Sequence, residues 1–331
     1  MSPLSRRTFL KSSATAAVAS SLPALKLAAQ ASKPFQSAFR VAVISDEISQ
    51  DFDHACSVIA NEFGLQWVEL RGMWDKNIMA LHDDDISKAN AILDKYKLRV
   101  TDIASPLFKV DWPEAPISKY SPMRDKKSDT FGASFAFKAQ DEVLEKSIAL
   151  AKQFKTERVR CFDFWRIDDQ TPYRKAIDAK LIEAAATAGK HNILLVLENE
   201  YECNTATGRE SVRTLAAVQS PNLKLNWDPG NAVARGELDA FPAGFALIPK
   251  ARIGHCHVKC AVSKPGTASG FEWAAVGQGL PDWTEQFRAL KQAGYRDAVS
   301  LETHWRGAGT PEASTRISWA GMKAALEKAE A

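Results

Sequence analysis

Short hydrophobic runs alternate with longer amphipathic stretches along the chain from about residue 39. Compact apolar runs bounded by turn residues predict strands, whereas apolar residues spaced three and four positions apart predict helices. The predicted strands are 40–44, 66–70, 99–104, 158–162, 192–197, 223–227, 251–257 and 298–302. The predicted helices are 51–63, 84–96, 141–154, 173–189, 210–219, 242–248, 283–293 and 311–328.

This alternation indicates an α/β protein with a parallel sheet. Eight repeats favour a single (β/α)8 TIM barrel over residues 32–331. A doubly wound open sheet is the alternative, but no Gly-x-Gly-x-x-Gly follows the first strand. Long loops are expected at 105–138, after the third strand, and at 261–280, after the seventh. Loops at the carboxyl ends of barrel strands surround the active site, so both are candidate lids; plain surface insertions are the other interpretation.

The first 31 residues have the features of an export signal. Arg6 and Arg7 form a twin-arginine motif, a weakly apolar Ala/Ser/Val stretch follows, and Ala29-Gln30-Ala31 offers a cleavage site. We therefore predict a twin-arginine (Tat) signal peptide at 1–31 and a periplasmic mature protein. A disordered N-terminus with a chance arginine pair is the alternative. The apolar stretch is too short and too polar for a membrane span, so no stable membrane insertion is expected after cleavage.

Removing this segment changes the charge balance. It holds four basic residues and no acidic ones, so the net charge of +3 becomes −1 in the mature chain. A nearly neutral protein argues against a dedicated nucleic-acid binder. The five cysteines are odd in number and lack a disulfide-framework spacing, so we interpret them as small buried hydrophobic residues. The sequence leaves the oligomeric state open, a homo-oligomer included.

Candidate chemistry lies at the ends of the last four predicted strands. These runs end in Glu198, in Asp228, in a histidine of the 255–257 segment and in Glu302. Parallel strands deliver their carboxyl ends to one face of a barrel, so the four side chains are expected to meet there. Two Glu, one Asp and one His make a hard, mostly oxygen site. Such a site suits one divalent metal ion, namely Mn²⁺, Co²⁺, Mg²⁺ or Zn²⁺.

Side-chain alternation along these strands separates polar from apolar residues. The apolar sets are expected to face the helices and the polar sets to point into the barrel. Burying so many charges without partners would be costly, and a divalent cation would offset that cost. The polar sets are Lys224, Asn226 and Asp228; His255, His257 and Lys259; and Ser300, Glu302 and His304.

Four motifs at these positions are similar to motifs of a known protein superfamily. They are Leu197-Glu198-Asn199-Glu200, Trp227-Asp228-Pro229-Gly230-Asn231, His255-Cys256-His257-Val258-Lys259 and Leu301-Glu302-Thr303-His304. With them the chain resembles the xylose-isomerase-like TIM-barrel superfamily of sugar isomerases and epimerases. The resemblance implies that one divalent metal is held by Glu198, Asp228, His257 and Glu302. It also implies that the two ligand glutamates exchange a proton on a substrate carbon next to a carbonyl.

The residue types agree with this chemistry. A metal stabilises the enediolate formed when a proton leaves the carbon next to a carbonyl, and carboxylates on both sides of that carbon can remove and return the proton. Glu198 and Glu302 are therefore the candidate acid and base. Lys259 is expected to polarise a hydroxyl or oxyanion, unless it only neutralises carboxylates. His255 is expected to hydrogen-bond a ligand or the substrate, unless it is a core residue.

Further polar and aromatic residues are candidates for substrate contacts. Glu69 and Arg71 could instead form a structural pair, Glu200 could be a loop charge, and the tryptophans could be packing residues. Arg166, Trp74 and Trp305 are weaker candidates of the same kind. The substrate-binding candidates are Glu69, Arg71, Arg160, Glu200 and Trp165.

Two departures from the superfamily pattern affect the expected substrate. Asn231 stands near the position where many sugar epimerases carry a histidine, and Cys260 replaces an acid that often follows the lysine. Export also disfavours sugar phosphates, so a non-phosphorylated sugar or keto-sugar is expected. One alternative is a metal-dependent 3-keto-glycoside lyase or hydrolase using the same site. A second is a non-catalytic periplasmic sugar-binding protein. The superfamily also has a DNA-repair endonuclease branch with three metals, which needs many more histidine and acidic ligands and a basic groove. That branch is disfavoured because the chain has only six histidines and a mature charge near −1.

Overall fold

The computed structural model describes residues 34–121 and 136–331. The predicted signal peptide and part of the loop at 105–138 lie outside the described residues. Eight parallel strands form one sheet in the order β1-β12-β9-β8-β7-β6-β5-β2. The strands are β1 (Arg40–Val43), β2 (Trp67–Leu70), β5 (Arg99–Leu107), β6 (Arg158–Cys161), β7 (Leu194–Glu198), β8 (Leu223–Trp227), β9 (Ile253–Val258) and β12 (Ala298–Leu301).

The two end strands of this sheet approach each other at one point. A parallel bridge joins Ile44, which follows β1, to Glu69 of β2. The sheet is therefore a nearly closed barrel, and the predicted (β/α)8 architecture is confirmed.

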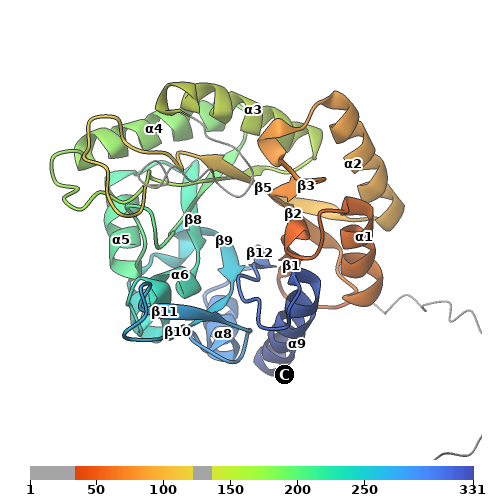
Figure 1. Ribbon diagram of the computed structural model, residues 1–331. Helices are drawn as coiled ribbons and strands as arrows, with labels where there is room; N and C mark the ends of the chain where they lie inside the picture. Colours follow the sequence, from red (N-terminus) through yellow and green to blue (C-terminus); the bar gives the residue numbers. More distant parts are fainter. Residues whose placement is uncertain (1–33, 122–135) are drawn as a thin grey trace, which may run out of the picture. The chain divides into compact units, whose positions relative to one another are not determined.

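Helices surround the strands (Figure 1). The one expected at 51–63 is helical throughout, but it changes from α1 to a π-helix at Val58–Glu62. The helix expected at 242–248 is present as a π-helical segment, Ala240–Gly244, that continues into Phe245–Leu247; inside that segment Phe241 has an extended backbone. The α-helices are α1 (Phe52–Ser57), α2 (Asp83–Tyr96), α3 (Gln140–Gln153), α4 (Arg174–Lys190), α5 (Gly208–Ala217), α6 (Pro229–Ala234), α7 (Phe245–Leu247), α8 (Trp283–Gln292) and α9 (Pro311–Glu330).

Short helix α6 was not expected from the sequence pattern. It begins directly after β8, where Pro229 occupies the first turn. The Asp228 side chain caps this helix by accepting a hydrogen bond from the Asn231 backbone N–H. The cap fixes Asp228 at the carboxyl end of β8. Its Oδ1 atom accepts the capping hydrogen bond.

The strand register confirms the predicted sorting of side chains. His257 of β9 pairs with Ser300 of β12, and Asn226 of β8 pairs with His255 of β9, so the polar residues share one side of the sheet. Their apolar neighbours, such as Val258 in β9, join the hydrophobic core. The barrel interior is consequently polar near the carboxyl ends of these strands.

Two small hairpins project from the carboxyl ends of barrel strands. β3 (Gly72–Met73) pairs with β4 (Lys76–Asn77) after β2, and β10 (Cys260–Ser263) pairs with β11 (Phe271–Ala274) after β9. The loop expected at 261–280 thus contains an ordered antiparallel hairpin. Strands this short leave too few residues for a recognisable sequence period.

Two further expectations concern the whole chain. All five cysteines lie in the described part of the chain, where they are buried and unpaired. Among the described residues, no helix combines the length and apolar character needed to cross a bilayer.

Candidate active site at the carboxyl ends of the barrel strands

The four predicted metal ligands meet in space. Glu198 ends β7, Asp228 follows β8, His257 lies in β9, and Glu302 follows β12. Their potential ligand atoms all lie within 4.8 Å of one another, and all four side chains are buried. Four strands therefore deliver one compact cluster to one end of the barrel.

His257 lies at the centre of this cluster. Its Nδ1 atom is 3.3 Å from Glu198 Oε1, 3.3 Å from Glu302 Oε2 and 3.7 Å from Asp228 Oδ2. Its Nε2 atom lies 3.0 Å from Glu69 Oε1 on the other side of the ring. A proton on Nε2 donated to Glu69 leaves the Nδ1 lone pair facing the three carboxylates, and this is the arrangement of a metal-ligating histidine.

The cluster fits a divalent cation. Three carboxylates face one ring nitrogen, which cannot donate to all of them at once. Asp228 Oδ2 lies 2.9 Å from Lys259 Nζ without hydrogen-bond geometry, so this buried oxygen accepts no hydrogen bond from the described residues. A buried carboxylate oxygen without a hydrogen bond is costly, and a cation held by three oxygens and one nitrogen would satisfy it.

Cations flank both glutamates of the cluster. Lys259 Nζ lies 2.5 Å from Glu302 Oε2, and Arg160 Nη1 lies 3.1 Å from Glu198 Oε2. Burial alone would raise the pKa of each glutamate. Lys259 and His257 instead hold the pKa of Glu302 well below its usual range, and His257 and Arg160 lower that of Glu198. Both side chains are therefore ionised at neutral pH.

Asp228 has the opposite shift. Burial raises its pKa to about 7, and the charges of Glu198 and Glu302 add to this effect, although Lys259 opposes it. The crowding of three carboxylates therefore leaves the metal-free cluster holding a proton that a cation would displace.

Comparison with known proteins identifies the family. Residues 58–325 match the sequence model described as the xylose isomerase-like TIM barrel. The chain belongs to this family. The matched range includes every strand of the barrel except β1. No curated protein matches the chain.

Several solved structures share this xylose isomerase-like fold. The IOLI protein with a bound zinc atom is 15% identical, with a TM-score of 0.65 over 88% of this chain and 99% of that one. A D-allulose 3-epimerase from Methylomonas sp. in complex with D-allulose is 18% identical, with a TM-score of 0.56 over 90% and 99%. The probable 3-DHS dehydratase AsbF from Bacillus anthracis is 21% identical, with a TM-score of 0.60 over 86% and 98%. At these identities the likeness shows the fold alone.

Within this xylose isomerase-like barrel, two predicted site residues lie beneath the ligand cluster. Glu69, a predicted substrate contact, is fully buried and faces the His257 ring. His255, a predicted catalytic residue, is also fully buried, with Nε2 3.1 Å from Asp102 Oδ1 and Nδ1 3.1 Å from Asn226 Oδ1. Their positions favour roles in supporting the site from the barrel interior over direct contact with a substrate.

The other predicted substrate contacts pair with charged residues in or near the cluster. Arg71 donates to Glu302 Oε1 at 3.0 Å, so both Arg71 and Arg160 pair with cluster glutamates. Glu200 lies 3.1 Å from Lys109 Nζ. The same ammonium group lies 5.2 Å from the Trp165 ring centroid. Arg71, Arg160, Glu200 and Trp165 therefore remain predicted substrate contacts.

Three charged residues near the site were not identified from the sequence. Asp46 and Glu47 follow β1 and accept hydrogen bonds from Arg71, which links them to Glu302. Lys109 follows β5 and pairs with Glu200. Each comes within a few residues of a barrel strand end, so the rule that located the metal ligands would have found them if applied to the first and third strands.

Asn231 has a defined place in the site. Its side-chain amide donates to Glu198 Oε1 at 3.1 Å, while its backbone N–H is capped by Asp228. The residue that replaces the expected histidine therefore orients a candidate ligand glutamate.

Proposed function

We propose that the protein is a metal-dependent sugar isomerase or epimerase acting on a non-phosphorylated sugar or keto-sugar. The observation that carries this proposal is the pair of buried, ionised glutamates. Glu198 and Glu302 lie at equal distances of 3.3 Å from the Nδ1 atom of His257, where a cation fits. Two bases at one cation site are suited to moving a proton between the faces of a carbon or between adjacent carbons. Family membership and the epimerase among the structural neighbours support it.

We further propose that Glu198, Asp228, His257 and Glu302 hold one Mn²⁺, Co²⁺, Mg²⁺ or Zn²⁺ ion. When bound, the ion would supply positive charge that stabilises negative charge developing on the substrate carbonyl oxygen. The hard donor set supports this proposal. The zinc atom in the IOLI protein structure is consistent with it.

The protein residues would then divide the proton transfer between them. One glutamate, as a carboxylate, accepts the proton from the carbon next to the carbonyl. The other glutamate first takes up a proton from solvent and then delivers it to the opposite face, which inverts that carbon, and the first glutamate releases its proton to solvent. Return to the neighbouring carbon instead gives isomerisation. Arg160 and Lys259 keep the glutamates ionised before the reaction, and Lys259 can also donate to a substrate hydroxyl or oxyanion.

Glu69 is expected to strengthen metal binding by orienting His257. His257 and His255 lower the pKa of Glu69 to about 2 although burial opposes this, so its charge favours the proton on His257 Nε2. Glu69→Gln is expected to weaken metal affinity roughly 10- to 100-fold, measured by metal titration calorimetry. Glu62→Gln, which changes an exposed pair with Arg316, is the matched control. Equal affinities in the two variants would contradict this role.

Metal affinity is expected to rise with pH. The pKa of Asp228 is raised from 3.8 to about 7, and neighbouring carboxylates raise that of His257 well above 6.5, although burial opposes the latter shift. Both groups therefore hold protons that the metal must displace, and low pH favours the metal-free form. We expect affinity to increase roughly tenfold per pH unit for each proton released between pH 6 and 8. Calorimetry in buffers of different ionisation enthalpy measures that release, and pH-independent affinity would contradict the expectation.

The proposed export of the protein bears on its proposed substrate. We propose that the chain is delivered to the periplasm by its twin-arginine segment, which supports a sugar without a phosphate group. A reporter fusion of residues 1–31 tests this, because Arg6→Lys with Arg7→Lys is expected to retain the reporter in the cytoplasm.

The decisive experiment is hydrogen exchange in D₂O. Free sugars, keto-sugars and 3-keto glycosides are incubated with protein and Mn²⁺, Co²⁺ or Mg²⁺, and deuterium at the carbon next to the carbonyl is measured. Deuterium in an epimer or isomer supports the proposal, whereas an eliminated product identifies the lyase alternative. Lack of exchange with every sugar, together with no bound metal in purified protein, would favour the sugar-binding alternative.

A further inference from the structure

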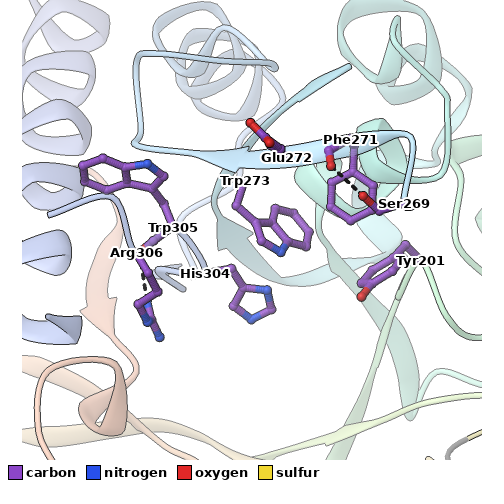
Figure 2. Close-up of a pocket in the computed structure, with 8 residues that line it drawn as sticks. All are labelled: Tyr201, Ser269, Phe271, Glu272, Trp273, His304, Trp305 and Arg306. Atoms are coloured by element: carbon purple, nitrogen blue, oxygen red, sulfur yellow. Dashed lines mark hydrogen bonds between the residues drawn. The ribbon is translucent and has the colours of Figure 1, made fainter. Parts of the chain in front are cut away.

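A pocket of about 530 Å³ opens beside the ligand cluster, and we call it the aromatic vestibule. Its walls come from three segments far apart in the sequence: the loop after β7, the β10–β11 hairpin and the segment after β12. Figure 2 shows Trp273 and His304 between Tyr201 on one side and Trp305 and Arg306 on the other. The lining residues are Tyr201, Ser269, Phe271, Glu272, Trp273, His304, Trp305 and Arg306.

The aromatic vestibule adjoins the candidate active site through two of its lining residues, His304 and Trp273. The His304 ring lies 4.9 Å from the Trp273 ring, and His304 Nε2 lies 3.4 Å from Glu302 Oε1. Lys259 Nζ lies 5.1 Å from the Trp273 ring centroid. His304 and Trp273 therefore connect the vestibule to Glu302 and Lys259, which face the proposed metal.

Aromatic rings hold one another in fixed orientations in this wall. Phe271 lies 4.9 Å from Trp273 and 5.3 Å from Tyr201, and Tyr201 lies 5.8 Å from Trp273, each pair being edge to face. Phe271 and Trp273 are two residues apart in β11 and so share a face of the hairpin. A rigid aromatic surface of this kind loses little conformational entropy when a flat ligand binds.

The rim of the vestibule is polar. Arg306 is exposed and His304 is half-buried, so a guanidinium and an imidazole lie beside the rings, whereas the Glu272 side chain lies on the other face of β11 and pairs with Lys264. A pyranose ring matches this surface because its C–H face can cover an aromatic ring while its hydroxyls hydrogen-bond to charged groups.

We propose that the aromatic vestibule binds a second pyranose ring, so that the substrate is a disaccharide or larger glycoside and not a free monosaccharide. The proposal rests on the proposed function for the sugar at the ligand cluster, and the vestibule adds the neighbouring unit. Trp273 is the central contact, because it touches both the other aromatic rings and His304.

The test compares binding of two ligands that differ by one ring. A 3-keto-disaccharide and the corresponding 3-keto-monosaccharide are titrated calorimetrically into the Mn²⁺-saturated protein. We expect the disaccharide to bind at least roughly tenfold more tightly, and Trp273→Ala to bring the ratio of affinities close to one. Trp67→Ala is the matched control: this partly buried tryptophan stacks with Arg40 and Arg99 at the start of β2 and is expected to retain the ratio.

A second variant and a third ligand complete the test. If Trp273→Ala does not fold, as judged by circular dichroism, Tyr201→Ala tests a second ring of the same aromatic wall and is expected to reduce the same ratio. Equal affinity of the wild type for both ligands would overturn the proposal, as would an unchanged ratio in the folded variants. An aryl 3-keto-glycoside that binds as tightly as the disaccharide would overturn the assignment to a sugar ring.

Deuterium exchange measured on the same samples separates this proposal from the proposed function. If deuterium is exchanged into both ligands and the wild type binds the two with equal affinity, the result would contradict the second-ring site and support the proposed enzymatic function. If the wild type binds the disaccharide more tightly than the monosaccharide but incorporates no deuterium into either, the result would contradict the proposed enzymatic function and support the second-ring site.

Discussion

Glu302→Gln is expected to reduce exchange at the carbon next to the carbonyl by roughly 10²- to 10⁴-fold. The amide preserves the shape of the side chain and can still direct an oxygen toward the cation, but it cannot accept the substrate proton. Its neutral charge also removes the ion pairs with Lys259 and Arg71. Exchange is measured by NMR at saturating metal, with metal content determined on the same sample.

A matched control separates this effect from a general loss of charge. Glu285→Gln changes an exposed carboxylate on α8 that pairs with Arg288, and we expect normal exchange. If Glu302→Gln binds metal and exchanges protons at the wild-type rate, Glu302 is not the acid or base. If only Glu198→Gln then abolishes exchange, a single base would act, and the two-glutamate scheme would be wrong.

His257→Ala is expected to weaken metal binding by at least roughly 100-fold and to remove metal-dependent activity. The variant loses the ring nitrogen that faces all three carboxylates, and it leaves those carboxylates with one fewer neutralising partner. For the wild type, metal at about 100 times its dissociation constant should stabilise the fold by about 2.7 kcal/mol. We expect this stabilisation to disappear in His257→Ala, as measured by thermal unfolding with and without metal.

The control for this prediction is another histidine of the same chain. His191→Ala changes a ring beside Lys152, away from the ligand cluster, and is expected to keep both metal affinity and the metal-dependent rise in unfolding temperature. Metal binding that survives in His257→Ala would show that the cation binds elsewhere. The acidic group of Glu47, Glu302 and His304 would then be the next site to test.

Much of the fold followed from local patterns. The alternation in β9 placed His255 and His257 on one face and Val258 on the other, and the structure has this arrangement. Eight strand–helix repeats, without a Gly-x-Gly-x-x-Gly after the first strand, favoured a barrel over a doubly wound sheet, and each repeat could be recognised because a strand and its helix form a local unit. The short helix α6 and the β10–β11 hairpin were not recognised, since each is too brief to show a period.

In the candidate site, too, some residues could be predicted from the strand pattern and others only from tertiary contacts. The strand pattern located Glu198, Asp228, Glu302 and a histidine of the 255–257 segment, because parallel strands bring their carboxyl ends to one face whatever the details of packing, and the family resemblance selected His257. The sequence named Glu69 only as a candidate substrate contact and could not pair it with His257, which lies 188 residues away along the chain. The aromatic vestibule was equally invisible, because it depends on rings from three segments meeting at distances of about 5 Å. Strand direction determines which end of the barrel a side chain occupies, whereas only the packed structure decides which side chains touch there.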